Sequence, residues 1–197
     1  MIGFNITSVT MDEMEVTRYG NEDTGETFTA ADYAIGSTFA TNLTDRFSIG
    51  INGKYIQQTI ANSHAKGFAL DIGTLFKTPF GFRLGTSISN FGQKLKMTGD
   101  DLLLGADVAD NIDGNNESVT SVLSTDHFDL PLVLRIGISH DIRIGKSNSL
   151  TLSVDAVSPN DNANYVNAGG SINFLNNMIS LYAGINSLFL EKSEKEI

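Results

Sequence analysis

Large apolar residues alternate with small or polar residues along most of the chain. Between Phe47 and Tyr55, large apolar residues occupy most odd-numbered positions, and Ser, Gly, Asn and Lys occupy the even-numbered ones. Successive residues of a β-strand point to opposite faces, whereas a helix would spread these apolar residues around its whole surface. The pattern therefore predicts a strand with one apolar face.

The same alternation recurs and predicts about nine strands, with no convincing amphipathic helix. Most of them are about 9–12 residues long, which is the length that a tilted membrane-spanning strand needs. Strands of soluble proteins are usually shorter, at about 5–6 residues. The predicted strands cover residues 2–8, 28–40, 47–55, 68–76, 80–90, 132–139, 150–155, 166–174 and 179–185.

Short and long connections alternate between these strands. The short ones are residues 42–45, 77–79, 143–148 and 175–177, and the long ones are residues 10–26, 61–66, 92–129 and 158–164. In an up-and-down meander this order places every tight turn at one end of the sheet and every longer loop at the other. Outer-membrane barrels have that asymmetry.

The second face of the predicted strands is rich in Gly, Ser, Thr, Asn and Ala, and carries few charges. A soluble lipocalin-like barrel would turn this face to water, and a water-facing surface is normally dense in Lys, Glu and Asp. Small residues with sparse charges of both signs suit a crowded lumen better. The charged residues expected to face the lumen are Lys54, Asp71, Arg83, Arg135 and Asp155.

These features predict an incomplete up-and-down antiparallel transmembrane β-barrel, with the apolar face against lipid and the polar face inside. A soluble β-sheet binding protein is the alternative. Residues 1–190 are expected to form the partial barrel, with a long link at 92–129, and residues 191–197 a charged tail. No signal peptide is recognisable at the N-terminus, so we expect targeting and closure to come from sequence beyond that given.

The lumen charges are expected to pair across neighbouring strands. Arg135 and Asp155 face the same side of consecutive strands, as do Asp71 and Arg83, so each pair could cross-link its strands. Such pairing commonly serves structure, because it avoids an unsatisfied charge. Contact with a transported substrate is the other possibility.

Aromatic residues lie near both ends of the apolar face. Tyr33, Tyr55 and Phe68 fall near the loop ends of their strands. Those near the turn ends are Phe39, Phe47, Phe76, Phe80, Phe82 and Phe174. They could form the two interfacial girdles of a spanning barrel. Ordinary aromatic core packing is the alternative.

Composition excludes several classes of function. The net charge is −10 and the 13 basic residues are scattered, which argues against a nucleic-acid partner. The chain has no cysteine, so it can form neither a disulfide nor a thiolate metal site. Its mean hydropathy of −0.04 is that of many soluble proteins. A membrane barrel reaches such a value as well, because a polar residue follows each apolar one.

Candidate chemical sites are weak, and we expect no catalytic, cofactor or metal site. The histidines His64, His127 and His140 lack metal-ligand spacing, and His140 is expected to be an interfacial anchor. Residues 139–141 contain Ser, His and Asp, but neighbours in a strand point to opposite faces and cannot form a triad.

Two further motifs are also expected to be incidental. Residues 63–66 have the Ser-x-x-Lys pattern of a nucleophile motif, but they are expected in a hairpin loop. The acidic segment 110–117 lacks the alternating ligand spacing of a calcium-binding EF-hand loop, so we expect a solvated loop there.

Several segments resemble the PorV/PorQ family of outer-membrane proteins. The most extensive is residues 68–92, which include Asp71-Ile-Gly73, Lys77-Thr-Pro79 and Ser89-Asn90-Phe91-Gly92. The others are residues 32–36, 43–48, 130–139, 155–162, 166–170 and 182–190. They are spread over about residues 28–190, in the order and spacing typical of the family.

The resemblance implies a fourteen-stranded barrel in the outer membrane of a Gram-negative-type bacterium, related to FadL-type transporters. It implies an accessory role in type IX secretion, in which the barrel binds or shuttles exported cargo. The expected partners are membrane lipid, secreted cargo proteins and secretion-system components. A FadL-like transporter of small hydrophobic compounds is the alternative function. The link at 92–129 is expected to fold outside the barrel or to plug it partly, and its apolar clusters suit contact with a protein or hydrophobic cargo.

Overall fold

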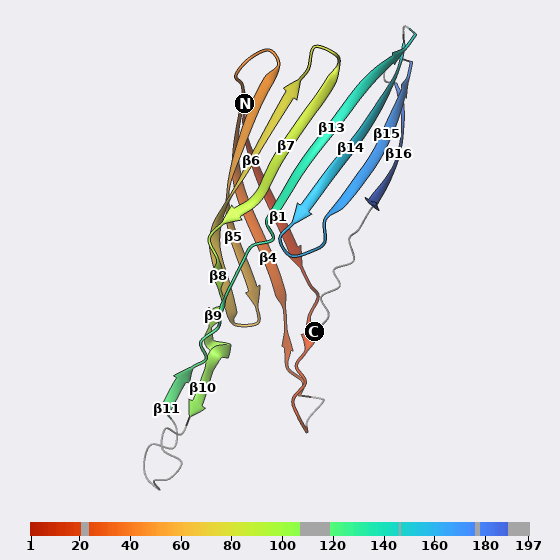
Figure 1. Cartoon of the computed structure of the whole chain (residues 1–197). Helices are drawn as coiled ribbons and strands as arrows, with labels where there is room; N and C mark the ends of the chain where they lie inside the picture. The colour runs from red at the N-terminus through yellow and green to blue at the C-terminus, as the bar shows by residue number, and fades with distance from the viewer. Residues whose placement is uncertain (21–23, 107–118, 146, 176–177, 189–197) are drawn as a thin grey trace.

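The computed structural model describes residues 1–20, 24–106, 119–145, 147–175 and 178–188. Nine long strands form one antiparallel sheet, in which each strand pairs with the next long strand along the chain (Figure 1). In sheet order they are β1 (Ile2–Thr10), β4 (Ala30–Asn42), β5 (Phe47–Ile60), β6 (Ser63–Lys77), β7 (Phe82–Gly92), β13 (Val133–Ile144), β14 (Asn148–Pro159), β15 (Tyr165–Phe174) and β16 (Ile179–Leu188).

The nine predicted strands and their up-and-down order are confirmed, but the described sheet is not closed into a barrel. Strands β1 and β16 form its two edges and do not pair with each other. Within the described residues, no helix has both the length and the apolar content needed to span a bilayer.

One predicted long connection, residues 61–66, is wrong. Strand β5 continues to Ile60, and β6 begins at Ser63. A two-residue turn joins them, in which Ala61 adopts a φ of 49°. The sequence from Ser63 to Lys66 lacks large apolar residues, so alternation does not reveal this part of the strand. Cross-strand pairing nevertheless holds it, because Thr59 lies opposite His64 and Ile60 opposite Ser63.

The start of one strand was also predicted too early. Residues 78–81 form the turn between β6 and β7, so Phe80 lies in the turn and not in the strand. The Thr78 hydroxyl donates a hydrogen bond to the Phe82 carbonyl and accepts one from the Phe82 amide. Gly81 adopts a φ of 86°, which glycine does without steric cost.

Most of the large apolar side chains lie on one face of the sheet and are exposed. Phe4 is 84% exposed, Phe68 65% and Ile136 53%. The residues that are buried lie on the other face and are mostly small, such as Ala65 and Ala69 of β6. This distribution is the reverse of that in a soluble protein, where large apolar side chains fill the core.

The face with small and polar residues is concave. Residues of six consecutive strands, from β4 to β14, line one hollow with a volume of about 640 Å³. A flat sheet could not bring these strands around one space, so the sheet curves toward this face. We call this face the inner face and the apolar one the outer face.

The link between β7 and β13 covers part of the inner face. Its short strands β8 (Leu95–Lys96) and β12 (His127–Phe128) pair with each other, while β9 (Thr98–Gly99) pairs with the start of β6. Leu95 is fully buried and packs with Leu130 against small side chains of β6. The link then leaves the sheet as a two-stranded ribbon of β10 (Leu103–Ala106) and β11 (Val119–Val122) (Figure 1).

The base of the link thus packs on the inner face and the ribbon projects from the sheet. Because the described sheet is not closed, plugging of a barrel by the link, or its folding outside one, stays a prediction. A short 3-10 turn, η1 (Asp100–Leu102), joins these two parts. A similar small ribbon, β2 (Met14–Glu15) with β3 (Thr27–Phe28), lies in the connection between β1 and β4.

Asp101 attaches the link to the turn between β5 and β6. Its carboxylate accepts hydrogen bonds from the Asn62 amide nitrogen at 2.7 Å, the Asn62 side chain at 3.0 Å and the Ser63 hydroxyl at 3.2 Å. The bonds from the Asn62 side chain and backbone lower the pKa of Asp101 below its ordinary value, because they favour the charged form.

Gly67 is expected to be essential for the packing of the link. A Cβ atom at this position would clash with Cδ2 of Leu95. Gly67→Ala should therefore lower the free energy of unfolding by about 1–3 kcal/mol, through overpacking. Leu95→Ala alone should cost about 2–5 kcal/mol, and the double variant less than the sum, because the shortened side chain at position 95 leaves room for the new methyl group.

Denaturant unfolding of the three variants tests this expectation. Gly53→Ala is the control, because a Cβ at Gly53 meets Leu70 at an ordinary 3.8 Å. Strict additivity of the Gly67 and Leu95 effects would contradict the proposed contact.

Acid is expected to release the link from the turn. Because the pKa of Asp101 is lowered in the folded state, its contribution is complete above the ordinary Asp value of about 3.9 and disappears as the pH falls through the lowered pKa. Hydrogen exchange of the Asn62 amide, corrected for intrinsic rates, should show protection at neutral pH that is lost in acid. The Ala61 amide donates to the backbone of Thr29 and should stay protected. Simultaneous loss at both amides would refute the role of Asp101.

Candidate functional site

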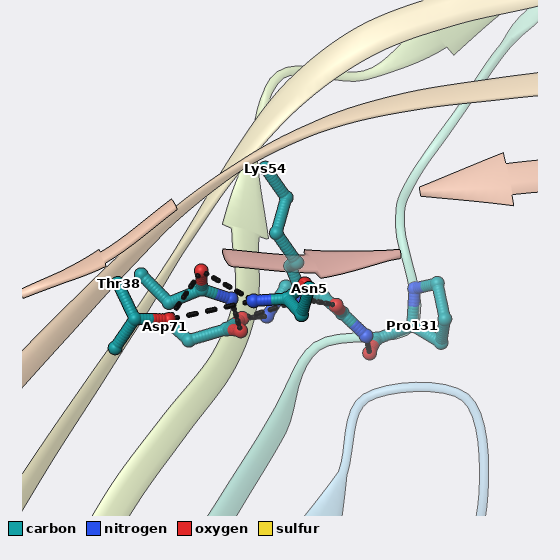
Figure 2. Close-up of polar contacts among 7 residues, drawn as sticks. Asn5, Thr38, Lys54, Asp71 and Pro131 are labelled. Carbon is teal, nitrogen blue, oxygen red and sulfur yellow. Dashed lines mark hydrogen bonds and ion pairs between the residues drawn. The ribbon is translucent and has the colours of Figure 1, made fainter. Parts of the chain in front are cut away.

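A network of polar side chains crosses the inner face near its centre (Figure 2). Lys54 of β5 forms an ion pair with Asp71 of β6, with 2.7 Å between Nζ and Oδ1. Lys54 also donates a hydrogen bond to the side-chain oxygen of Asn90 in β7. Asn90 in turn donates from Nδ2 to the Pro131 carbonyl at 2.8 Å. The network thus ties three strands to the segment that leads into β13.

A β-bulge brings Asn90 into this network. The register between β6 and β7 shifts between Leu70 and Ile72, and Asn90 adopts a φ of 61°. Asparagine tolerates this left-handed conformation better than most residues. The bulge directs the backbone N–H of Asn90 to Oδ1 of Asp71, with 2.8 Å between N and Oδ1. The carboxylate that binds Lys54 therefore also stabilises the irregular backbone.

The network continues toward the N-terminal edge of the sheet through neutral side chains. Asn52 donates to Oδ2 of Asp71 at 2.9 Å. Its own oxygen accepts hydrogen bonds from Thr38 of β4 at 3.0 Å and from Asn5 of β1 at 3.1 Å. Five neighbouring strands are therefore linked by side chains on the inner face, in addition to their backbone ladders.

The predicted pair of Asp71 and Arg83 is wrong. Arg83 lies opposite Lys77 in the register of β6 and β7, six residues from Asp71, a separation of about 20 Å along a strand. Arg83 instead binds β13. Its Nη2 donates to Oδ1 of Asp141 at 2.8 Å, and its Nε donates to the Ser139 hydroxyl at 3.2 Å.

The predicted pair of Arg135 and Asp155 is not formed, although both residues lie on the inner face and line the hollow. The ion pairs among the described residues do not include Arg135. The Asp155 carboxylate lies against Gly137, its partner in the register, where a Cβ would clash with Oδ1. Glycine at this position leaves the space that the carboxylate occupies.

The five predicted charges, Lys54, Asp71, Arg83, Arg135 and Asp155, lie on the concave side of the sheet, and that this side faces a lumen stays a prediction. Their partners differ from those predicted. Arg83, Arg135 and Asp155 line the hollow, whereas Lys54 and Asp71 belong to the polar network. The hollow therefore offers guanidinium groups and a carboxylate among small Gly and Ser residues.

Three residues of the site were not singled out as site residues by the sequence analysis: Asn52, Asn90 and Asp141. Asp141 is in phase with Arg135 along β13, so extending the alternation beyond residue 139 would have placed it on the inner face. Asn52 is in phase with Lys54 in the same way. The role of Asn90 depends on the bulge, which alternation does not reveal.

The candidate chemical motifs do not assemble into a reactive site. Ser139 and Asp141 face the inner side with Arg83, while His140 stacks on Phe82 at the outer face, with ring centroids 4.2 Å apart. Ser63 lies in β6, not in a loop, and donates its hydroxyl hydrogen to Asp101. Within the described residues no three His, Asp or Glu side chains gather as metal ligands, and the acidic segment 110–117 lies outside those residues.

Some of the predicted aromatic girdle residues pair on the outer face. The rings of Tyr55 and Phe68 lie 5.4 Å apart toward the loop end of β5 and β6. Phe47 and Phe76 are opposite each other in the register at the turn end of the same strands. The positions fit two bands, and contact of these bands with lipid stays a prediction.

Comparison of the sequence with models of protein families gave no match, and comparison with curated proteins gave none either. The likeness to the PorV/PorQ family therefore depends on the sequence segments described above.

The ion pair of Lys54 and Asp71 is expected to contribute more to stability than an exposed one. The two side chains are only 13% and 25% exposed. Asp71→Asn should cost about 1.5–3 kcal/mol, the value typical of hydrogen bonds to charged groups. The control is Asp129→Asn, which breaks the exposed pair with Lys94 and should cost no more than about 1 kcal/mol. Equal effects in denaturant unfolding would contradict this ranking.

Proposed function

We propose that this chain forms part of an outer-membrane β-barrel, with lipid against the outer face and a polar lumen on the inner face. The single observation that supports this most strongly is the exposure of large apolar side chains along the outer face, opposite small buried residues. Exposed apolar surface of this extent on a soluble monomer would mark an interaction site, and a continuous lipid-facing band is typical of a transmembrane barrel.

Strand length supports the same proposal. The nine long strands have 9 to 15 residues. A strand tilted in a bilayer needs about 9–11 residues to cross it. Strands β5 and β6 exceed that need, so in a membrane their hairpin would extend beyond the lipid, at the end where the link leaves the sheet.

We infer that the barrel acts as an accessory of type IX secretion of the PorV/PorQ kind, which binds or shuttles exported cargo proteins. The resemblance of residues 68–92 and of the shorter segments supports this role. So does the projecting ribbon, which offers a surface to other proteins. The partners in this proposal are membrane lipid, exported cargo and secretion-system components, and the location is the outer membrane of a Gram-negative-type bacterium.

A FadL-like conduit for small hydrophobic compounds is less well supported by the inner face. Such a conduit needs a largely apolar pocket. Most of the lining of the hollow is apolar, but Arg83, Arg135 and Asp155 also line it and would have to be desolvated by an apolar ligand.

Neighbouring residues on opposite faces of β14 provide a test of membrane insertion. Leu152 points outward and is 49% exposed, whereas Ser153 lines the hollow. In lipid vesicles, Leu152→Lys should lower the free energy of unfolding by about 2–4 kcal/mol, because it places a charge in the bilayer. Ser153→Lys should have a small effect. If the outer face met water, Leu152→Lys would change stability by no more than about 0.5 kcal/mol, and the proposal would fail.

The cellular role is tested by removing the gene. Exported proteins should then lose their surface attachment, and they should co-purify with the chain after crosslinking in cells that retain it. Uptake of hydrophobic compounds should be unchanged. Normal surface attachment together with a loss of uptake would support the FadL-like function instead.

A further inference from the structure

The negative charge of the chain is concentrated in the link between β7 and β13. Residues 97–134 contain eight of the 23 acidic residues and none of the 13 basic residues. The whole link, residues 93–132, also contains Lys94 and Lys96, so its net charge is −6 of the chain's −10. Four of these acidic residues, Asp100, Asp101, Asp126 and Asp129, are described in the structure.

Two of the described carboxylates have a partner and two do not. Asp101 is bound by Asn62 and Ser63, and Asp129 forms an ion pair with Lys94. Asp100 precedes β10 and Asp126 follows β11, so both lie toward the base of the ribbon. The ion pairs among the described residues include neither of them.

The ribbon itself exposes apolar side chains. Leu103 lies opposite Val122, and Ala106 lies opposite Val119. Its exposed large apolar residues are Leu103, Leu104, Val119, Val122 and Leu123. A ribbon of two four-residue strands is too small to bury these side chains by itself, and isolated two-stranded hairpins are only marginally stable in water.

The ribbon also has open backbone edges. The Leu123 amide donates to the Leu102 carbonyl, so these two residues face each other inside the ladder. Antiparallel strands alternate inward-facing and outward-facing backbone groups, and the groups of Leu103 and Gly105 therefore point to the outer edge of β10. Within the described residues β10 pairs with β11 and with no other strand.

We propose that the β10–β11 ribbon is a docking site for an extended protein segment in which apolar residues alternate with Lys or Arg. The segment adds as a third strand, with its backbone on the open edge, its apolar side chains against Leu103 and Val122, and its cations toward the carboxylates. The inference rests on the proposed function, since it names the chemistry of the exported protein that the barrel binds.

Charge decides between this occupant and two others. A second copy of the chain would bring the same negative link to the ribbon, and an anionic lipid surface would bring negative headgroups. Both are repelled, whereas a basic segment is attracted. Burial of the apolar side chains then supplies affinity, while the carboxylates supply the rate of association and the selectivity for basic partners.

A pair of synthetic peptides tests the proposal with the whole protein in detergent micelles. One labelled peptide alternates Val with Lys, and the other alternates Val with Glu. Fluorescence anisotropy should show binding of the Lys peptide and none of the Glu peptide. Binding should weaken at least several-fold at about 1 M salt, where the Debye length is only about 3 Å. Equal binding of both peptides would overturn the proposal.

Variants locate the binding site. Leu103→Ser with Val122→Ser should weaken binding of the Lys peptide at least tenfold, and Asp100→Asn with Asp126→Asn should weaken it several-fold at low salt. The matched controls are Leu43→Ser and Asp45→Asn, in the turn at the opposite end of the sheet, which should bind normally. Unchanged binding by the ribbon variants would overturn the proposal.

This result is independent of the test of membrane insertion. The ribbon lies outside the nine-stranded sheet, so its variants should leave the sheet folded, as judged by hydrogen exchange of the sheet amides. If Leu152→Lys lowers the free energy of unfolding as predicted, but the ribbon variants bind the Lys peptide as well as the unmodified protein does, only the docking site is refuted. If Leu152→Lys leaves the free energy of unfolding in vesicles unchanged, the proposed barrel is refuted.

Discussion

The curvature of the sheet limits the size of the side chains on its inner face, and much of the structure depends on this limit. Strands that curve toward one face bring its side chains together, so glycine, alanine and serine prevail there. Gly67 lies beneath Leu95 of the link, and Gly137 lies beneath the Asp155 carboxylate. Most of the larger apolar residues of the sheet lie on the convex side, where they are exposed, although Val157 of β14 is buried on the inner face.

Charges on the inner face then need partners from the same crowded surface. Lys54 of β5 pairs with Asp71 of β6. At the bulge, the backbone amide of Asn90 donates to the Asp71 carboxylate, and the side-chain oxygen of Asn90 accepts from Lys54. The irregular backbone and the ion pair therefore stabilise each other. Arg83 of β7 likewise forms an ion pair with Asp141 of β13. Arg135 has no such ion-pair partner among the described residues, and it faces the hollow.

Alternation predicted the strands and their faces because both follow from a local period of two. It could not predict the turn at residues 61–62, since Ser63 to Lys66 contain no large apolar residue to mark a strand. It also failed for charge pairing. Facing the same side is not enough for contact, and the register keeps Asp71 and Arg83 about 20 Å apart. The bulge at Asn90 is a non-local outcome, because it depends on a carboxylate in the neighbouring strand.

The central claim is that the outer face meets lipid and the inner face meets water. The chain has no cysteine, so single cysteines can report on each face without background. Fluorescent labels at Ile136 and Leu152 should be quenched by a lipid-bound quencher, and labels at Ser87 and Ser153 by an aqueous one, in vesicles that contain the folded protein. Quenching of the labels at Ile136 and Leu152 by the aqueous quencher would place the outer face in water, and quenching by neither would place it in a dry protein core; either result would contradict the account.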